Sequence, residues 1–248
     1  MKTSHLAALA AVVLAMCMLL SSRASAQTDP SVAVGALSAY PTIARTGTYP
    51  TLTWGISYPQ TVADIVTINT DGTLTPKTVP LTMDVRVLGA SVIVATTDYY
   101  GNLISSYYIP VSCQFSYNGG TWQQIFYGDV YAVNPATVVL TKSITSKYTL
   151  DFGGKYNWNG SWGPFINTLN YTNNNRNVIA LKNGDYPPVT CPLYNQPTVA
   201  SFLKPYMAAD GQVIIGPKDV IYLFEITTTN TNDPGFDMND LAILVTFR

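Results

Sequence analysis

Two stretches near the end of the chain, each apolar at almost every position, constrain the fold more than any other feature. Residues 220–227 and 241–247 carry apolar side chains at successive positions, and successive side chains of a strand point to opposite faces. A strand that is apolar on both faces is covered on both sides, so these two strands are expected at the centre of a layered fold. The polar segment 230–240 connects them and gathers Asp and Asn side chains where the chain re-enters the core.

The rest of the chain indicates many short strands separated by turn signals. Asn118-Gly119 is one such signal and predicts a hairpin. Only residues 198–207 resemble a helix, and Pro205 keeps that helix short. Frequent short strands predict an all-β fold, and we expect a two-sheet antiparallel β-sandwich that is jelly-roll-like. The expected strands are 49–59, 65–70, 81–87, 91–97, 103–111, 113–117, 121–127, 137–140, 148–152, 178–182, 220–227 and 241–247.

The first 26 residues have the pattern of a secretory signal. Lys2 precedes an apolar run at 6–20, and the small residues Ala24-Ser25-Ala26 form a cleavage site. A membrane anchor is the alternative, but this run is shorter than the roughly 20 residues that a spanning helix needs. We therefore expect residues 27–248 to be one exported domain without a membrane span, located outside the cell, at its surface or in a periplasm.

Two cysteines, Cys113 and Cys191, follow the predicted signal. In an exported chain a pair of cysteines most simply forms one disulfide, which would tie the middle of the chain to its later third. The alternative is two independently buried thiols.

Several function classes are disfavoured by residues that the chain lacks. The only histidine, His5, lies in the predicted signal, so the exported chain has no imidazole for a Ser-His-Asp triad or for zinc. No basic run is present, and we expect no nucleic-acid partner. Paired carboxylates remain available for glycoside cleavage, although Glu225 is the only glutamate. Glycoside hydrolysis is therefore the third hypothesis, behind two non-enzymatic ones.

The acidic connection is the first candidate site. Carboxylate and amide oxygens are the ligands that calcium prefers, and clustered acids indicate such a site. The spacing is not that of the twelve-residue helix-loop-helix calcium loop. Asp-Pro-Gly and Asn-Asp are also ordinary turn chemistry, so a calcium site and a plain turn both stay open. The candidate ligands are Asp233, Asp237, Asn239, Asp240 and Glu225.

The segment 235–245 resembles the C-terminal signature of secreted bacterial domains of unknown function. In those domains the last strand is introduced by Asp, an aromatic or apolar residue, Asn-Asp and an apolar run. Asp237, Asn239, Asp240 and Leu241 match this motif, whereas Met238 replaces the commoner aromatic residue. The acidic, Gly-rich lead-in is shortened here. The resemblance implies a β-rich, exported domain and adds support for calcium.

The second candidate site is an aromatic segment at 152–165. Tyr156, Trp158 and Trp162 share a parity, so in a continuously extended chain they project from one face. Aromatic rings between Asn and Ser residues can stack on sugars and bond their hydroxyls. Filling of the core by these rings is the alternative interpretation.

The sequence thus favours an exported, non-enzymatic β-sandwich module, stabilised by calcium, that acts outside the cell or at its surface. A carbohydrate-binding module is the second hypothesis. The expected partners are glycans or other cell-surface and extracellular proteins.

Overall fold

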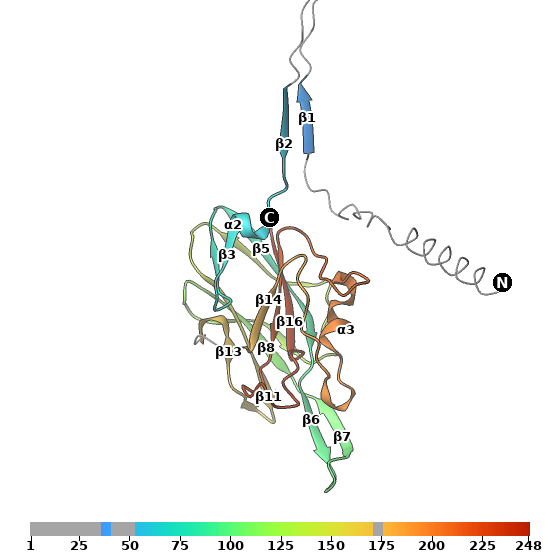
Figure 1. Ribbon diagram of the computed structural model, residues 1–248. Helices are drawn as coiled ribbons and strands as arrows, with labels where there is room; N and C mark the ends of the chain where they lie inside the picture. The colour runs from blue at the N-terminus through green and yellow to red at the C-terminus, as the bar shows by residue number, and fades with distance from the viewer. Residues whose placement is uncertain (1–35, 41–52, 171–175) are drawn as a thin grey trace, which may run out of the picture. The chain divides into compact units, whose positions relative to one another are not determined.

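The computed structural model describes residues 36–40, 53–170 and 176–248, and the chain divides into two compact units, residues 1–59 and 60–248. In the first unit, β1 (Ala36–Tyr40) and β2 (Thr53–Ser57) form an antiparallel pair. All further elements belong to the second unit (Figure 1). The predicted signal lies outside the described residues, and the expected single domain over 27–248 stays a prediction.

The second unit is built of two antiparallel sheets, which confirms the predicted all-β sandwich (Figure 1). The five-stranded sheet has the order β10 (Val138–Ile144), β5 (Leu81–Ala90), β16 (Leu241–Phe247), β15 (Asp219–Phe224) and β14 (Val178–Leu181). The seven-stranded sheet has the order β3 (Val66–Ile68), β4 (Leu74–Pro76), β11 (Leu150–Trp158), β8 (Val111–Tyr117) and β9 (Gln123–Gly128). Two short strands, β12 (Ser161–Trp162) and β13 (Ile166–Asn167), also pair with β11.

The main core lies between the two sheets. Alternate residues of β5, β15 and β16 point into it from one sheet, and alternate residues of β8 and β11 point into it from the other. Phe152 of β11, for example, lies next to Tyr222 of β15, with ring centroids 5.5 Å apart. Because side chains alternate along each strand, only one face of each sheet contributes to this main core.

A second, smaller core covers the outer face of the five-stranded sheet. Ile221, Leu223 and Leu244 point away from the main core and are buried by the segment 182–216. That segment contains α3 (Val199–Leu203). The residue before the helix, Thr198, is its N-cap, and the Thr198 side chain accepts a hydrogen bond from the Ser201 amide at 3.1 Å. The predicted short helix is thereby confirmed. Because β15 and β16 have cores on both faces, the prediction that these two strands are central is also confirmed.

The remaining elements are short. They are the helix α2 (Val62–Ile65) and the 3-10 turns η1 (Thr168–Asn170), η2 (Leu193–Asn195) and η3 (Lys204–Tyr206). A separate two-stranded hairpin, β6 (Ile93–Thr97) with β7 (Leu103–Tyr108), extends past one end of the sandwich (Figure 1).

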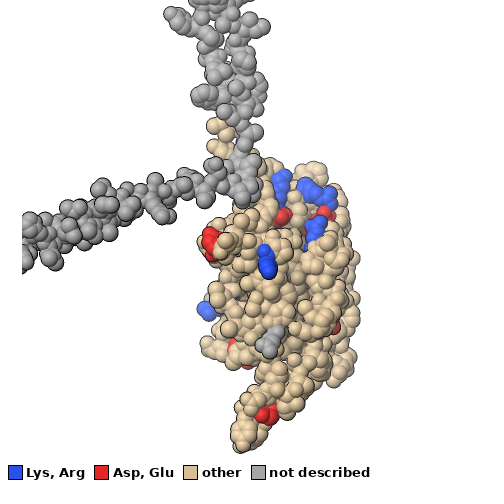
Figure 2. All heavy atoms as spheres, turned by 90° about the vertical axis from the view of Figure 1, so that its right-hand side faces the viewer, with Lys and Arg blue, Asp and Glu red and all other residues tan. Residues whose placement is uncertain are grey.

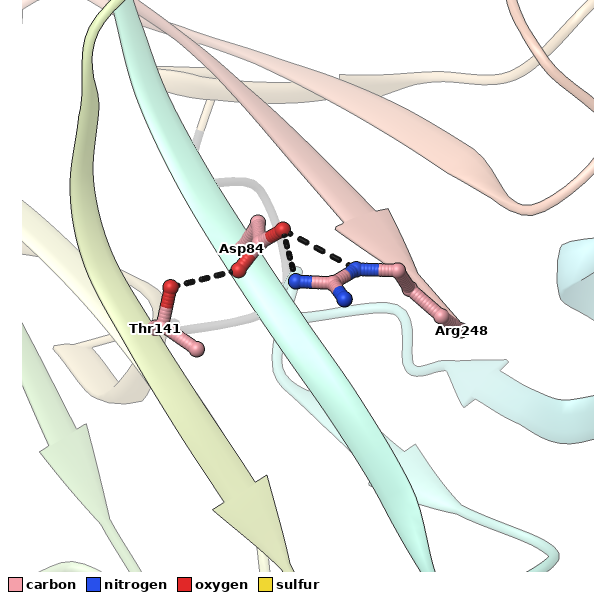
Figure 3. Close-up of polar contacts among 3 residues, drawn as sticks. All are labelled: Asp84, Thr141 and Arg248. Carbon is pink, nitrogen blue, oxygen red and sulfur yellow. Dashed lines mark hydrogen bonds and ion pairs between the residues drawn. The ribbon is translucent and has the colours of Figure 1, made fainter.

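The end of β16 is tied to β5 by a polar contact. Asp84, 6% exposed, accepts hydrogen bonds from Thr141 of β10 and from the guanidinium of Arg248 (Figure 3). The Thr141 hydroxyl and then Arg248 lower the pKa of Asp84 against the opposing effect of burial. A single strand-bridging carboxylate therefore links three neighbouring strands of the sheet.

The predicted disulfide is not formed. Cys113 and Cys191 are both free, the first buried and the second exposed. Cys113 points into the main core from β8, because it shares the inward parity of Val111 and Phe115. Cys191 lies in a loop on the surface. The prediction was wrong because a thiol enclosed between the sheets has no route to one in solvent without opening the core.

Candidate functional site

Three carboxylates meet where β15 ends and β16 begins. The ladder pairs Phe224 with Leu241, so Glu225, just after β15, and Asp240, just before β16, are the next residues along the two strands. Asp237 folds back from the loop to join them. One oxygen from each of Glu225, Asp237 and Asp240 lies within 4.8 Å of the others. The register of two central strands therefore brings together acids that are separated in sequence.

All three carboxylates are buried. Their exposed fractions are 0% for Glu225, 2% for Asp237 and 3% for Asp240. Among the described residues the one ion pair joins Arg248 to Asp84, so no basic side chain pairs with the cluster. Burying several acids without a cationic partner is costly, because a charged carboxylate loses its hydration.

Backbone amides supply part of the missing compensation. Glu225 Oε1 accepts hydrogen bonds from the amides of Thr227 at 3.1 Å and Thr228 at 3.2 Å. Its Oε2 accepts from the amide of Asp237 at 3.1 Å. The Ile226 amide donates to Asp240 Oδ2 at 2.7 Å. The chain thus wraps its N–H groups around the acids, as in other backbone anion-binding loops.

The shifted pKa values show that these amides do not fully offset burial. Burial raises the pKa of Asp237 to about 6, and the neighbouring Glu225 charge adds to the increase. Burial, followed by the Glu225 charge, raises the pKa of Asp240 well above its ordinary value. The cluster consequently favours taking up positive charge, either as protons or as a cation.

Two oxygens at the site have no hydrogen-bond partner. They are Asp237 Oδ2 and Asn239 Oδ1, and both are buried. Buried polar atoms without partners are uncommon and often mark an ion or water position. Hard oxygen donors of this kind fit calcium better than they fit a transition metal. The cluster can therefore hold a metal ion, and its chemistry agrees with a hard divalent cation.

Three of the five predicted ligands lie together in the structure, and the other two make different contacts. Asp237, Asp240 and Glu225 converge, whereas Asp233 is exposed and accepts a hydrogen bond from the Gly235 amide at 2.8 Å within its own turn. Asn239 is fully buried, and its side-chain amide nitrogen donates a hydrogen bond to the Pro197 carbonyl at 2.9 Å. This bond ties the loop 230–240 to the segment 182–216. Asp233 thus behaves as the turn residue that the sequence left open as an alternative.

Asn177 supports the site and was not predicted. Its side-chain amide donates to the carbonyls of Glu225 at 2.8 Å and Thr228 at 2.6 Å, and the Glu225 amide donates to the Asn177 carbonyl at 2.9 Å. These bonds hold the turn that presents the amides to the carboxylates. Asn177 lies in an Asn-rich segment just before β14, where nothing distinguishes it from its neighbours in the sequence.

The three predicted sugar-binding rings do not share a face. Antiparallel pairing of β12 with β11 sets Trp162 opposite Asn157, and cross-strand partners lie on the same side of a sheet. Trp162 is therefore on the face opposite to Tyr156 and Trp158. The expectation was wrong because the turn at Asn159-Gly160, with φ of 50° and 84°, reverses the chain and ends the assumed extended parity.

Their surroundings differ as well. Tyr156 packs against the main core. Trp158, 47% exposed, donates a hydrogen bond from Nε1 to the Tyr107 hydroxyl at 3.1 Å. Trp162 is also 47% exposed. Its ring centroid lies 4.4 Å from the ammonium nitrogen of Lys155, and the ring packs edge-on against Tyr127. A flat three-ring platform is not formed, and glycan binding stays a prediction.

No helix in the described ranges is long and apolar enough to cross a membrane. Comparisons with family models, with characterised proteins and with solved structures return no match. The resemblance of residues 235–245 to secreted bacterial domains therefore stays a prediction.

Proposed function

We propose that this protein is an exported, non-enzymatic β-sandwich module whose C-terminal loop is held in place by calcium bound at Glu225, Asp237 and Asp240. The single observation that carries the proposal is the convergence of three buried carboxylates within 4.8 Å, without a basic partner among the described residues. The unpartnered Oδ2 of Asp237 supplies a further reason, because a cation there would give this oxygen the contact that it lacks.

The position of the cluster supports a structural role for the ion. It joins the end of β15 to the start of β16, and these are the two strands covered by core on both faces. The Ser91 amide, just after β5, also donates to the Asp240 carbonyl at 3.0 Å. A cation bound here would neutralise the loop charges and join the ends of β15 and β16 at one end of the sandwich, next to the end of β5.

Burial argues against glycoside cleavage by the same carboxylates. A glycosidase needs its two acids on either side of a sugar, with room for the substrate and a water molecule. Glu225 is 0% exposed and Asp240 is 3% exposed, so a polysaccharide has no access to them without opening of the loop. These acids are therefore better suited to holding an ion than to attacking a substrate.

Calcium titration of the purified protein tests the proposal directly. Extracellular calcium modules bind with dissociation constants of about 0.1–1 mM. At about 10 mM calcium, the tighter limit corresponds to roughly 2.7 kcal/mol of added stability, which raises the melting midpoint by about 5–10 °C for a domain of this size. Calorimetric titration should show binding over the same range, and a chelator should reverse the change in midpoint.

Two matched variants locate the site. Asp240→Asn removes one charge from the cluster while keeping the side-chain shape, and we expect it to abolish the calcium response. Asp233→Asn removes an exposed charge from the same loop, and the response should persist. An unchanged midpoint with calcium and chelator in the unmodified protein would contradict the proposal, and so would equal responses of the two variants.

The export part of the proposal rests on residues 1–26 of the sequence. N-terminal sequencing of the secreted product should start at Gln27. An uncleaved product retained in the cytoplasm would contradict this part while leaving the metal site intact.

A further inference from the structure

The stretch 186–197 belongs to the segment 182–216 that covers the second core, and few hydrogen bonds hold it. Prolines at positions 187, 188, 192 and 197 have no N–H to donate. Among the described residues its backbone makes one hydrogen bond to another backbone group, from the Gln196 amide to the Leu193 carbonyl at 3.3 Å. Figure 2 views the side on which α3 lies in Figure 1, and most of this face carries no charged side chain. The few contacts that the stretch does make therefore determine how firmly it is held.

Two side-chain hydrogen bonds join the end of this stretch to residues beside the three clustered carboxylates. The Asn239 side-chain amide donates to the Pro197 carbonyl at 2.9 Å. The Ser91 hydroxyl donates to Gln196 Oε1 at 3.3 Å, and the Ser91 amide donates to the Asp240 carbonyl at 3.0 Å. The end of the sandwich that gathers the acids thus also holds the neighbouring surface stretch.

Met238 connects the same cluster to the second core. Its amide donates a hydrogen bond to Glu225 Oε2 at 3.3 Å. Its side chain is 1% exposed and belongs to the second core together with Val199 and Leu203 of α3. Its φ of 60° lies in the left-handed region, which residues with a side chain adopt rarely and which often marks a functional segment. Met238 therefore contacts an acid with its backbone and the core beneath α3 with its side chain.

We propose that a cation at the carboxylate cluster controls how firmly residues 186–203 are held on the five-stranded sheet. Because calcium must bind there, this coupling rests on the proposed function. Met238 and Asn239 lie between the ligands Asp237 and Asp240 along the chain. A movement that separates these two carboxylates therefore also displaces the contacts that Met238 and Asn239 make with the segment 182–216.

Charge repulsion opposes the held arrangement when no cation is bound. Three acids within 4.8 Å of one another repel when they are ionised, which favours their separation. A cation bound by all three binds only the arrangement in which they lie together, so it shifts the equilibrium toward the held state. With a dissociation constant of about 0.1–1 mM, about 10 mM calcium should make opening of the segment roughly 10–100-fold less frequent.

Amide hydrogen exchange of the purified protein measures this opening. The amides of Ser201 and Phe202 report on α3, because both are bonded to the Thr198 carbonyl. Their exchange in about 10 mM calcium should be roughly 10–100-fold slower than in chelator. The Asn118 amide, bonded to the Thr149 carbonyl at 2.8 Å in the other sheet, is the reference and should change less than ~2-fold.

Matched variants test the contacts that carry the coupling. Met238→Ala keeps all three carboxylates, so calcium should still bind in calorimetric titration, but the slowing at Phe202 should fall below ~3-fold. Met83→Ala removes the same side chain from the main core, where Met83 is 0% exposed, and should keep the full slowing. Gln196→Ala removes the Ser91 contact without altering the acidic loop and should reduce the slowing at least ~3-fold. It replaces the first variant if Met238→Ala does not fold.

The outcomes separate this coupling from the proposed function. A titration without calcium binding would contradict both. Calcium binding that leaves exchange at Ser201 and Phe202 unchanged would overturn the coupling alone. Equal slowing at Asn118 would show a general stabilisation of the fold, and full slowing in both Met238→Ala and Gln196→Ala would show that these contacts do not carry the effect. Either of these two results also overturns the proposal.

Discussion

Neutralising Asp237 is the perturbation that separates a buried proton site from a metal site. Asp237 is 2% exposed, and burial together with the Glu225 charge raises the pKa of its carboxyl from 3.8 to about 6. The folded chain therefore binds this proton more tightly than the unfolded chain does. The resulting stability is complete below the unfolded pKa and is lost as the pH rises through about 6.

The shift in the pKa of Asp237 determines how strongly folding stability depends on pH. A difference of about two pKa units corresponds to roughly 3 kcal/mol of folding stability that is lost between acidic and neutral pH. Asp237→Asn removes this loss, because the amide does not ionise. Its nitrogen replaces one unpartnered oxygen, which costs about 1 kcal/mol. In chelator at about pH 8 the variant should therefore be more stable than the unmodified protein by roughly 2 kcal/mol.

Calcium should reverse that order. The unmodified protein gains stability from the ion, whereas the variant lacks one ligand, so urea unfolding with calcium should find the variant less stable. Asp240, whose pKa is also raised, keeps part of the pH dependence in the variant. If the variant is less stable than the unmodified protein in chelator at about pH 8, the buried charge at Asp237 is not a net cost, and the reasoning is refuted.

Three further predictions follow from other parts of the sandwich. Thiol titration of the native protein should detect Cys191 at once and Cys113 only after unfolding, because burial encloses Cys113 and raises its pKa to about 12; two thiols reacting at equal rates would contradict this. Gly154→Ala should lower stability by about 1–3 kcal/mol in urea unfolding, since overpacked cores are strained. An added Cβ there would lie 2.8 Å from the Leu241 side chain, and an unchanged midpoint would show that the core yields freely. Asp84→Asn should cost about 1–2 kcal/mol at neutral pH through its weakened polar contacts. Since the pKa of Asp84 is lowered in the fold, this difference should shrink as the pH falls below the ordinary carboxyl value of 3.8 and vanish once the folded carboxyl is protonated. A difference that persists after protonation would point to packing instead.

The strand pattern of this chain was predictable because it depends on local periodicity. The apolar runs at 220–227 and 241–247 predicted two strands covered on both faces, and β15 and β16 have a core on each side. The turn at Asn118-Gly119 likewise predicted the β8–β9 hairpin, in which both residues adopt positive φ. The same Asn-Gly signal occurs at Asn159-Gly160, where it reverses the chain before Trp162, so this turn was available from the sequence.

The sequence also showed that acidic residues gather in the loop 230–240, but it did not show which of them come together. Asp233 and Asp237 lie in one loop and have the same side chain, yet only Asp237 reaches Glu225. The pairing of Phe224 with Leu241 decides which acids meet, and that register depends on packing across two sheets. Periodicity reports which face a side chain points to along one strand. Only the assembly of the strands decides which distant residues converge, and it equally decides that Cys113 and Cys191 are separated. The physical reason is that the free energy of assembly comes from contacts between residues far apart in the chain.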